Sequence, residues 1–118
     1  MIADFDIFKK HVRADDYEAD DELLMTYLKA ATRQVVNATG YSMEELETIP
    51  PGEFPEDILN AIYMRGASMY AFREDVDSTS LGMLPLSLMA IIKPYCKMYG
   101  GGLLAPLVEK YNEETGEG

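Results

Sequence analysis

The segment from Phe54 to Glu74, FPEDILNAIYMRGASMYAFRE, constrains the fold more than any other part of the chain. Pro55 suits the first turn of a helix, where its missing N–H would have no partner in any case. Glu56 and Asp57 then place negative charge at the positive end of the helix dipole. A helix with apolar residues on more than one side packs against several neighbours, and in so small a protein another copy of the chain is one candidate neighbour. The apolar residues of this segment are Ile58, Leu59, Ile62, Tyr63, Met69, Tyr70 and Phe72.

A second long helix is predicted from about Asp20 to Thr39. Gly40 follows it at the position where glycine commonly ends a helix. Lys29 and Arg33 lie four residues apart on the far side of this helix, away from its apolar stripe. The stripe recurs at helical spacing and consists of Leu23, Leu24, Tyr27, Leu28, Ala31, Val35 and Ala38. We expect the two long helices to form a central antiparallel pair.

Shorter helices flank this pair in the predicted fold. Asp4 can cap a helix that runs to about Val12. Ser42 and Glu45 form a capping-box pair that opens a short helical turn, and the Pro-Pro-Gly sequence at 50–52 ends it. One face of the first short helix holds Phe5, Phe8 and Val12.

The last third of the chain is predicted to contain a loop, a helix and a flexible end. Residues 75–84, DVDSTSLGML, have no helical period and are expected to form an exposed loop. Pro85 then opens a last helix, which Pro94 ends or kinks. The core candidates in this helix are Leu88, Ile91 and Ile92.

No strand pattern is found, so the predicted fold class is all-α. We expect a small helical bundle with a long central antiparallel helix pair plus short flanking helices. Residues 1–99 are assigned to this helical domain. Residues 100–118 begin with three glycines and are expected to be a flexible C-terminal extension.

The chain of 118 residues carries a net charge of -11. This charge argues against non-specific nucleic-acid binding, which needs lysine and arginine beside the phosphates, and against binding to anionic membrane surfaces. Solubility is one reason for such a charge, and a surface that lies near DNA without binding to it is another. The first ten residues do not resemble a signal peptide, and no stretch is long enough for a transmembrane helix. We therefore expect a soluble protein that is cytoplasmic when made.

Residues that could support catalysis are few. A nucleophilic pair would need His11, the single histidine, which lies in the polar stretch KKHVR and is typical of a solvated helix end. Cys96, the single cysteine, is more simply a packed thiol than a nucleophile. No phosphate-binding, dinucleotide-binding or zincin motif is present. We predict that the protein is not an enzyme and binds no cofactor or metal.

Two acidic segments offer weaker alternatives. The run from Arg13 to Glu22 invites comparison with a calcium loop, but it lacks the ligand spacing, central glycine and distant glutamate of an EF-hand. The run from Asp77 to Leu81 resembles the prosthetic-group site of acyl carrier proteins only in three common residues. A solvated turn and an exposed loop are the simpler interpretations.

Several short motifs follow one another in a specific order over residues 1–95. Before the central helix they are His11-Val12-Arg13-Ala14-Asp15, the acidic run, Glu22-Leu23-Leu24, Tyr27-Leu28, Ala30-Ala31 and Thr39-Gly40. Within and after it they are Pro55-Glu56-Asp57-Ile58, Ala61-Ile62, Tyr70, Arg73-Glu74, Leu84-Pro85 and Ile92-Lys93-Pro94-Tyr95. This series resembles the small head–tail connector (head-completion, or DNA-packaging adaptor) proteins of tailed bacteriophages and prophages. The specificity of the resemblance lies in the order and spacing of the motifs.

The resemblance implies a structural subunit that assembles as a ring of about a dozen copies. The ring would lie beneath the portal protein at the head–tail junction of the virion, extend the DNA channel without sequence-specific DNA binding, and dock the next head-completion or tail protein. Candidate residues for contact between subunits are Tyr63, Met64, Ala67 and Tyr70, for which core packing is the alternative role. Candidate channel-facing acids are Asp15, Asp16, Glu18, Asp20 and Asp21. Candidate residues of a partner-docking loop are Asp77, Ser78, Leu81 and Met83.

A different class of function stays open beside this one. A small acidic helical binding module, or regulator, would dock on a basic partner protein. Such a module predicts a stable complex with that partner and no ring.

Overall fold

The computed structural model describes residues 2–13, 18–50, 52–71, 86–97, 103–104 and 106–108. All regular structure in these residues is helical, which confirms the all-α prediction. No helix among them has both the length and the apolar character needed to cross a membrane. In chain order the helices are α1 (Phe5–His11), α2 (Asp21–Thr39), α3 (Met43–Glu47), α4 (Glu56–Ala71), α6 (Leu86–Ile92) and the 3-10 helix η1 (Lys93–Tyr95).

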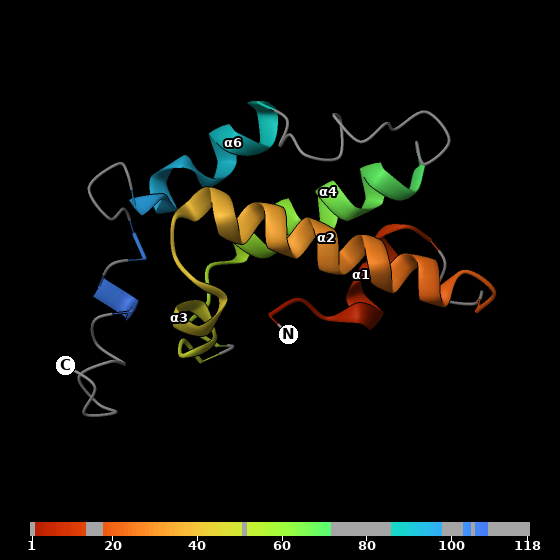
Figure 1. Ribbon diagram of the computed structural model, residues 1–118, viewed down its shortest axis with the longest axis horizontal. Helices are drawn as coiled ribbons and strands as arrows, with labels where there is room; N and C mark the ends of the chain where they lie inside the picture. The colour runs from red at the N-terminus through yellow and green to blue at the C-terminus, as the bar shows by residue number, and fades with distance from the viewer. Residues whose placement is uncertain are drawn as a thin grey trace.

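The two longest helices, α2 and α4, pack along each other and form the centre of the fold, as predicted (Figure 1). They run in opposite directions, so that Tyr70 near the end of α4 meets Asp20 just before α2. The shorter helices lie around this pair. Four residues of the predicted stripe are buried, namely Leu24, Leu28, Ala31 and Val35, whereas Leu23, Tyr27 and Ala38 are half-buried. Three further residues that the stripe did not include are also buried, namely Thr32, Val36 and Thr39.

Local sequence signals set the ends of several helices. Gly40 ends α2 in the left-handed conformation, with a φ of 83°, and its N–H donates to the carbonyl of Asn37. The side chain of Asp4 caps α1 by accepting from the N–H of Ile7. Ser42 and Glu45 form the predicted capping box at the start of α3. These side chains and the glycine satisfy backbone groups that a helix end leaves without partners.

Helix α4 has neighbours on several sides, because α1, α2 and α6 all pack against it. Much of its apolar surface is therefore covered within the subunit. Its buried residues include Ile58, Ile62 and Met69, together with the polar Arg65. Nε of Arg65 donates to Oε1 of Gln34 on α2 at 2.8 Å, so this buried cation has a partner on the neighbouring helix.

The last helix begins at Leu86, directly after Pro85, and continues into η1, where Pro94 lies. The core candidates Leu88 and Ile92 are buried, and Ile91 is half-buried. The hydroxyl of Tyr95 donates to Oδ2 of Asp57 at 2.8 Å and so joins the end of this segment to the first turn of α4. The predicted loop at 75–84 lies outside the described residues.

Two side chains beyond the predicted helical domain belong to the core. Leu104 and Val108 are buried in the same apolar cluster as the central helices. The N–H of Leu103 donates to the carbonyl of Pro94 at 2.8 Å, which anchors this turn. The division of the chain at residue 99 stays a prediction.

Candidate functional site

The four candidate contact residues lie on different sides of α4, with Met64 and Ala67 on its outer side and Tyr63 and Tyr70 toward the neighbouring helices of the subunit. Met64 is 47% exposed and Ala67 is half-buried, and both lie on the side of the helix that also carries the exposed Glu56 and Asn60. Residues three and four apart share one face of a helix, so these side chains form a continuous stripe. We call it the outer stripe of α4, and it consists of Glu56, Asn60, Met64, Ala67 and Ala71.

Tyr63 lies on another side of α4 and packs within the subunit. Its ring is 5.0 Å from the ring of His11 and 6.5 Å from that of Phe8, measured between centroids, and only 4% of the residue is exposed. Its hydroxyl accepts a hydrogen bond from the backbone N–H of Asp4 at 2.9 Å. Burial raises the pKa of Tyr63, since the phenolate would be poorly solvated there. Tyr63 thus holds α1 against α4.

Tyr70 connects the two long helices. Its hydroxyl donates to Oδ2 of Asp20 at 2.5 Å, and its ring meets the ring of Tyr27 edge-on at 6.5 Å. An edge-on arrangement suits the charge distribution of aromatic rings. Both contacts lie where the end of α4 meets the start of α2.

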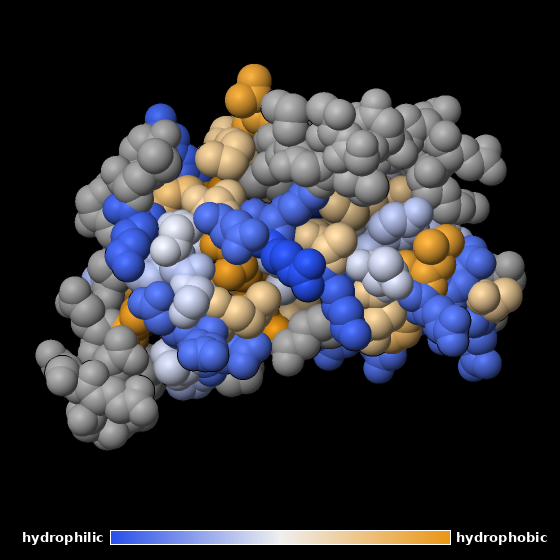
Figure 2. Space-filling view, in the orientation of Figure 1, coloured by the Kyte–Doolittle hydropathy of each residue, from blue (hydrophilic) through white to orange (hydrophobic). Residues whose placement is uncertain are grey.

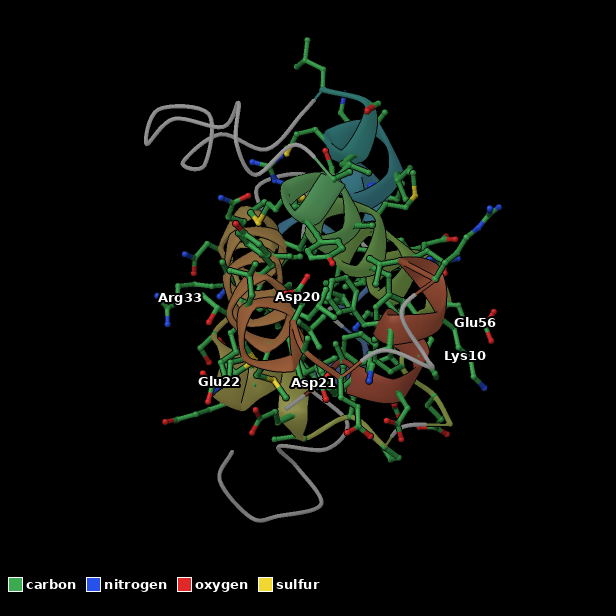
Figure 3. The ribbon with its side chains drawn as sticks, turned by 90° about the vertical axis from the view of Figure 1, so that its right-hand side faces the viewer. Lys10, Asp20, Asp21, Glu22, Arg33 and Glu56 are labelled. Atoms are coloured by element: carbon green, nitrogen blue, oxygen red, sulfur yellow. The ribbon has the colours of Figure 1, made fainter. Side chains whose placement is uncertain are left out.

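The candidate channel acids have different environments. Glu18 is exposed, whereas Asp20 accepts the hydrogen bond from Tyr70. Oδ1 of Asp21 is 2.9 Å from Nζ of Lys9, a mostly buried lysine of α1. Figure 3 shows Asp20 and Asp21 between α2 and the helices beside it. These two aspartates hold helices together, and the remaining candidates Asp15 and Asp16 lie outside the described residues.

The docking-loop candidates, which are Asp77, Ser78, Leu81 and Met83, also lie outside the described residues. Exposed apolar side chains elsewhere include Ile7, Leu86 and Leu103, at 46%, 87% and 60% exposure. The sequence singled out none of these three, although Ile7 falls off the face formed by Phe5, Phe8 and Val12. On the face seen in Figure 2, apolar residues form small separate areas among hydrophilic ones.

Neither residue considered for nucleophilic chemistry has a catalytic setting. Cys96 is fully buried, its Sγ lies 3.4 Å from the carbonyl oxygen of Ile92, and burial raises the pKa of the thiol, which disfavours the reactive thiolate. The ring of His11 lies against Tyr63. In the parts of the chain that the structure describes, no three carboxylate, histidine or cysteine side chains gather as a metal site would require.

The paired polar groups inside the fold were missed by sequence reasoning. Arg65 with Gln34, Lys9 with Asp21, and Tyr95 with Asp57 each join elements far apart in the sequence. One signal was available: a single arginine inside the apolar run of α4 indicates a buried cation that needs a partner. Its partner was not predictable, because it lies on a different helix.

Comparison with known proteins identifies the family. A model described as "Phage gp6-like head-tail connector protein" matches residues 2–95, a range that includes every helix from α1 to η1. No curated protein and no solved structure matches. The match confirms the resemblance seen in the motifs and the expectation that the protein is structural and not an enzyme. The chain belongs to the phage gp6-like head-tail connector protein family.

Proposed function

We propose that copies of this protein form a ring beneath the portal of a tailed phage or prophage and extend the DNA channel. The observation that carries the proposal is the family match over residues 2–95. The partners are then the portal protein and the next head-completion or tail protein, and the site of action is the head–tail junction of the virion. A ring of about a dozen copies needs a contact between two different faces of the subunit, repeated until it closes.

The outer stripe of α4 supports Met64 and Ala67 as residues of that contact. Met64 is half-exposed although it is a large apolar side chain, and such a side chain gains free energy when a neighbour covers it. Tyr63 and Tyr70 already contact α1 and α2 in their own subunit. Tyr63 is almost fully covered by these contacts, whereas Tyr70 is half-buried and keeps part of its surface exposed.

The acidic character of the chain supports the passage of DNA. A net charge of -11 gives the protein a negative field, and like charge prevents the phosphate adhesion that would slow a sliding duplex. Glu18 is the exposed member of the described candidates. We propose that Glu18, with Asp15 and Asp16 of the same acidic run in the sequence, faces the channel, while Asp20 and Asp21 hold the start of α2 against α4 and α1.

The loop residues Asp77, Ser78, Leu81 and Met83 are proposed to contact the portal or the next protein of the junction. These four residues of the predicted loop comprise one acid, one hydroxyl and two apolar side chains, and interfaces of this mixed kind are common in assemblies that form from separate soluble parts.

The test combines the full chain with a portal protein from the same phage or prophage. Electron microscopy and native mass spectrometry of the mixture should show a closed ring of this protein on the portal, on the face that receives the tail. A stable complex with a basic protein and no ring would favour the alternative of a small acidic binding module. A chain that stays monomeric at every concentration, with portal present, would contradict the proposed function.

A further inference from the structure

Four exposed charges form a complementary pattern on opposite sides of the subunit. Figure 3 views the molecule along its long axis, with Arg33 and Glu22 on one outer side and Glu56 and Lys10 on the other. Arg33 lies above Glu22 on the left, and Glu56 lies above Lys10 on the right. All four residues are exposed. In this view the positive Arg33 is therefore level with the negative Glu56 on the opposite side, and the negative Glu22 is level with the positive Lys10.

These charges are free to serve a second molecule. None of these four side chains takes part in an ion pair among the described residues. An ion pair found there joins Lys9 to Asp21. An exposed charge without a partner inside the subunit loses no internal contact when it pairs with a neighbour. This separates the four from Asp20 and Asp21, which are engaged inside the fold.

The spacing of the two charges along the helix axes is similar on the two sides, and their order matches the level pairs of Figure 3. Glu22 and Arg33 are eleven residues apart on α2, about 16 Å of helix rise, with Glu22 at the end where α4 finishes. On the other side Lys10 precedes His11, whose ring contacts Tyr63. Tyr63 is seven residues beyond Glu56, about 10 Å further toward that same end of α4. The long stems of arginine and lysine can cover the difference of a few ångströms.

We propose that neighbouring copies of this protein pack side by side, with Arg33 of one copy against Glu56 of the next and Glu22 against Lys10. This inference rests on the proposed ring function and specifies which faces meet in it. The contact joins two different faces, as a ring requires. An exposed ion pair contributes little affinity by itself, so the two crossed pairs mainly select the orientation and register of the copies.

The same arrangement covers the apolar part of the outer stripe of α4. Met64 lies two turns beyond Glu56 on that stripe, and Lys29 lies one turn before Arg33 on the exposed side of α2. With the antiparallel orientation that α2 and α4 adopt inside the subunit, Lys29 would come opposite Asn60 of the neighbour, about 6 Å of helix rise from Met64, and its aliphatic stem would extend toward Met64. The apolar contact then supplies affinity and the charges supply specificity.

Charge reversal is the first test. Arg33→Glu and Glu56→Arg should each raise the concentration needed for half-assembly about tenfold, as measured by light scattering and native mass spectrometry at low salt. The double variant R33E/E56R should recover assembly, because the pair is restored with its polarity exchanged. Glu47→Arg makes the same change in net charge as Glu56→Arg at an exposed position on a different helix, α3, and should have little effect. Thermal unfolding checks that each variant folds.

Cross-linking is the second test and reports geometry directly. The double variant R33C/E56C, treated with a short bis-maleimide, should give a ladder of covalent dimers, trimers and higher species. Each single variant should give no ladder, because a contact between two different faces needs both cysteines. R33C/E47C is the matched control and should not form a ladder. Cys96 is fully buried and is expected to stay unreactive.

The outcomes separate this inference from the function on which it rests. Rings on the portal whose assembly is unaffected by R33E and E56R, and which give no ladder with R33C/E56C, would overturn the proposed seam and leave the ring function standing. Failure of the unaltered chain to assemble at all, with or without portal, would overturn both. Loss in the single variants with recovery in R33E/E56R would establish the pairing.

Discussion

The ring of Phe8 on α1 fills the space that a side chain at Gly66 on α4 would need. A Cβ at Gly66 would lie 2.7 Å from Cε1 of Phe8, closer than real Cβ atoms approach another heavy atom. Phe8 is fully buried, so its ring has little room to shift. The absence of a side chain at Gly66 therefore allows α1 to pack directly on the central helix.

Gly66→Ala should destabilise the fold for this reason. Overpacking a well-filled core costs about 1–3 kcal/mol, and the better helix propensity of alanine offsets up to about 1 kcal/mol of that. We expect a net loss of about 1–2 kcal/mol in the free energy of unfolding, measured by urea denaturation. Gly52→Ala is the control, since a Cβ there would meet nothing within 4 Å. Equal stability of the two variants would contradict the close contact with Phe8.

The ion pair between Lys9 and Asp21 should stabilise the attachment of α1 to α2. The side chain of Lys9 is 10% exposed and that of Asp21 is 38% exposed, so the pair is only partly screened by solvent. A double-mutant cycle with Lys9→Met and Asp21→Asn should give a coupling free energy of about 1 kcal/mol. The coupling should fall in high salt. A coupling of zero at low salt would show that the two charges act independently.

The hydrogen bond from Tyr95 to Asp57 should make stability depend on alkaline pH. The bond to the carboxylate, burial, and the charge of Asp57 all raise the pKa of Tyr95 above its ordinary value of 10.0. Because the folded pKa is the higher one, the stabilisation is complete below pH 10 and is lost as the pH rises through the folded pKa. Tyr95→Phe should lower the free energy of unfolding by about 1 kcal/mol at neutral pH.

The comparison of pH profiles tests this assignment. The difference in stability between the unaltered chain and Tyr95→Phe should shrink above pH 10. Tyr27→Phe is the matched control, since its ring packs against Tyr70 and no hydrogen bond of its hydroxyl is present among the described residues. A constant difference across the whole pH range would assign the loss in Tyr95→Phe to packing alone.

Met64→Glu should weaken assembly on the portal while leaving the subunit folded. The side chain is 47% exposed, so a charge there costs little in the isolated chain, whereas burial of that charge against a neighbour costs a great deal. We expect at least about a tenfold loss in assembly, measured by native mass spectrometry of the complex with the portal. Met64→Leu keeps the apolar surface and should assemble normally. Normal assembly by Met64→Glu would remove the outer stripe of α4 from the contact.

The sequence by itself determined the helices and their ends, because these depend on short-range interactions. The Asp4 cap, the Ser42–Glu45 capping box and the left-handed Gly40 each act within a few residues of the chain. The apolar stripe of α2 has one clear side, so the centre of its buried face at Leu24, Leu28, Ala31 and Val35 was predictable, whereas the buried Thr32, Val36 and Thr39 at its edge were not. The order of the short motifs also identified the family, since order and spacing are properties of the chain alone.

Only the tertiary structure decided which side of α4 meets which helix. Its apolar residues surround most of the helix, so periodicity does not distinguish the faces. Tyr63 and Met64 are adjacent in sequence, yet about 100° of helical rotation separates them, and one is buried against α1 while the other is exposed. In the same way Asp20 is engaged by a tyrosine fifty residues away, whereas Glu18 is exposed. Such contacts join distant parts of the chain, and their geometry exists only after the helices have packed.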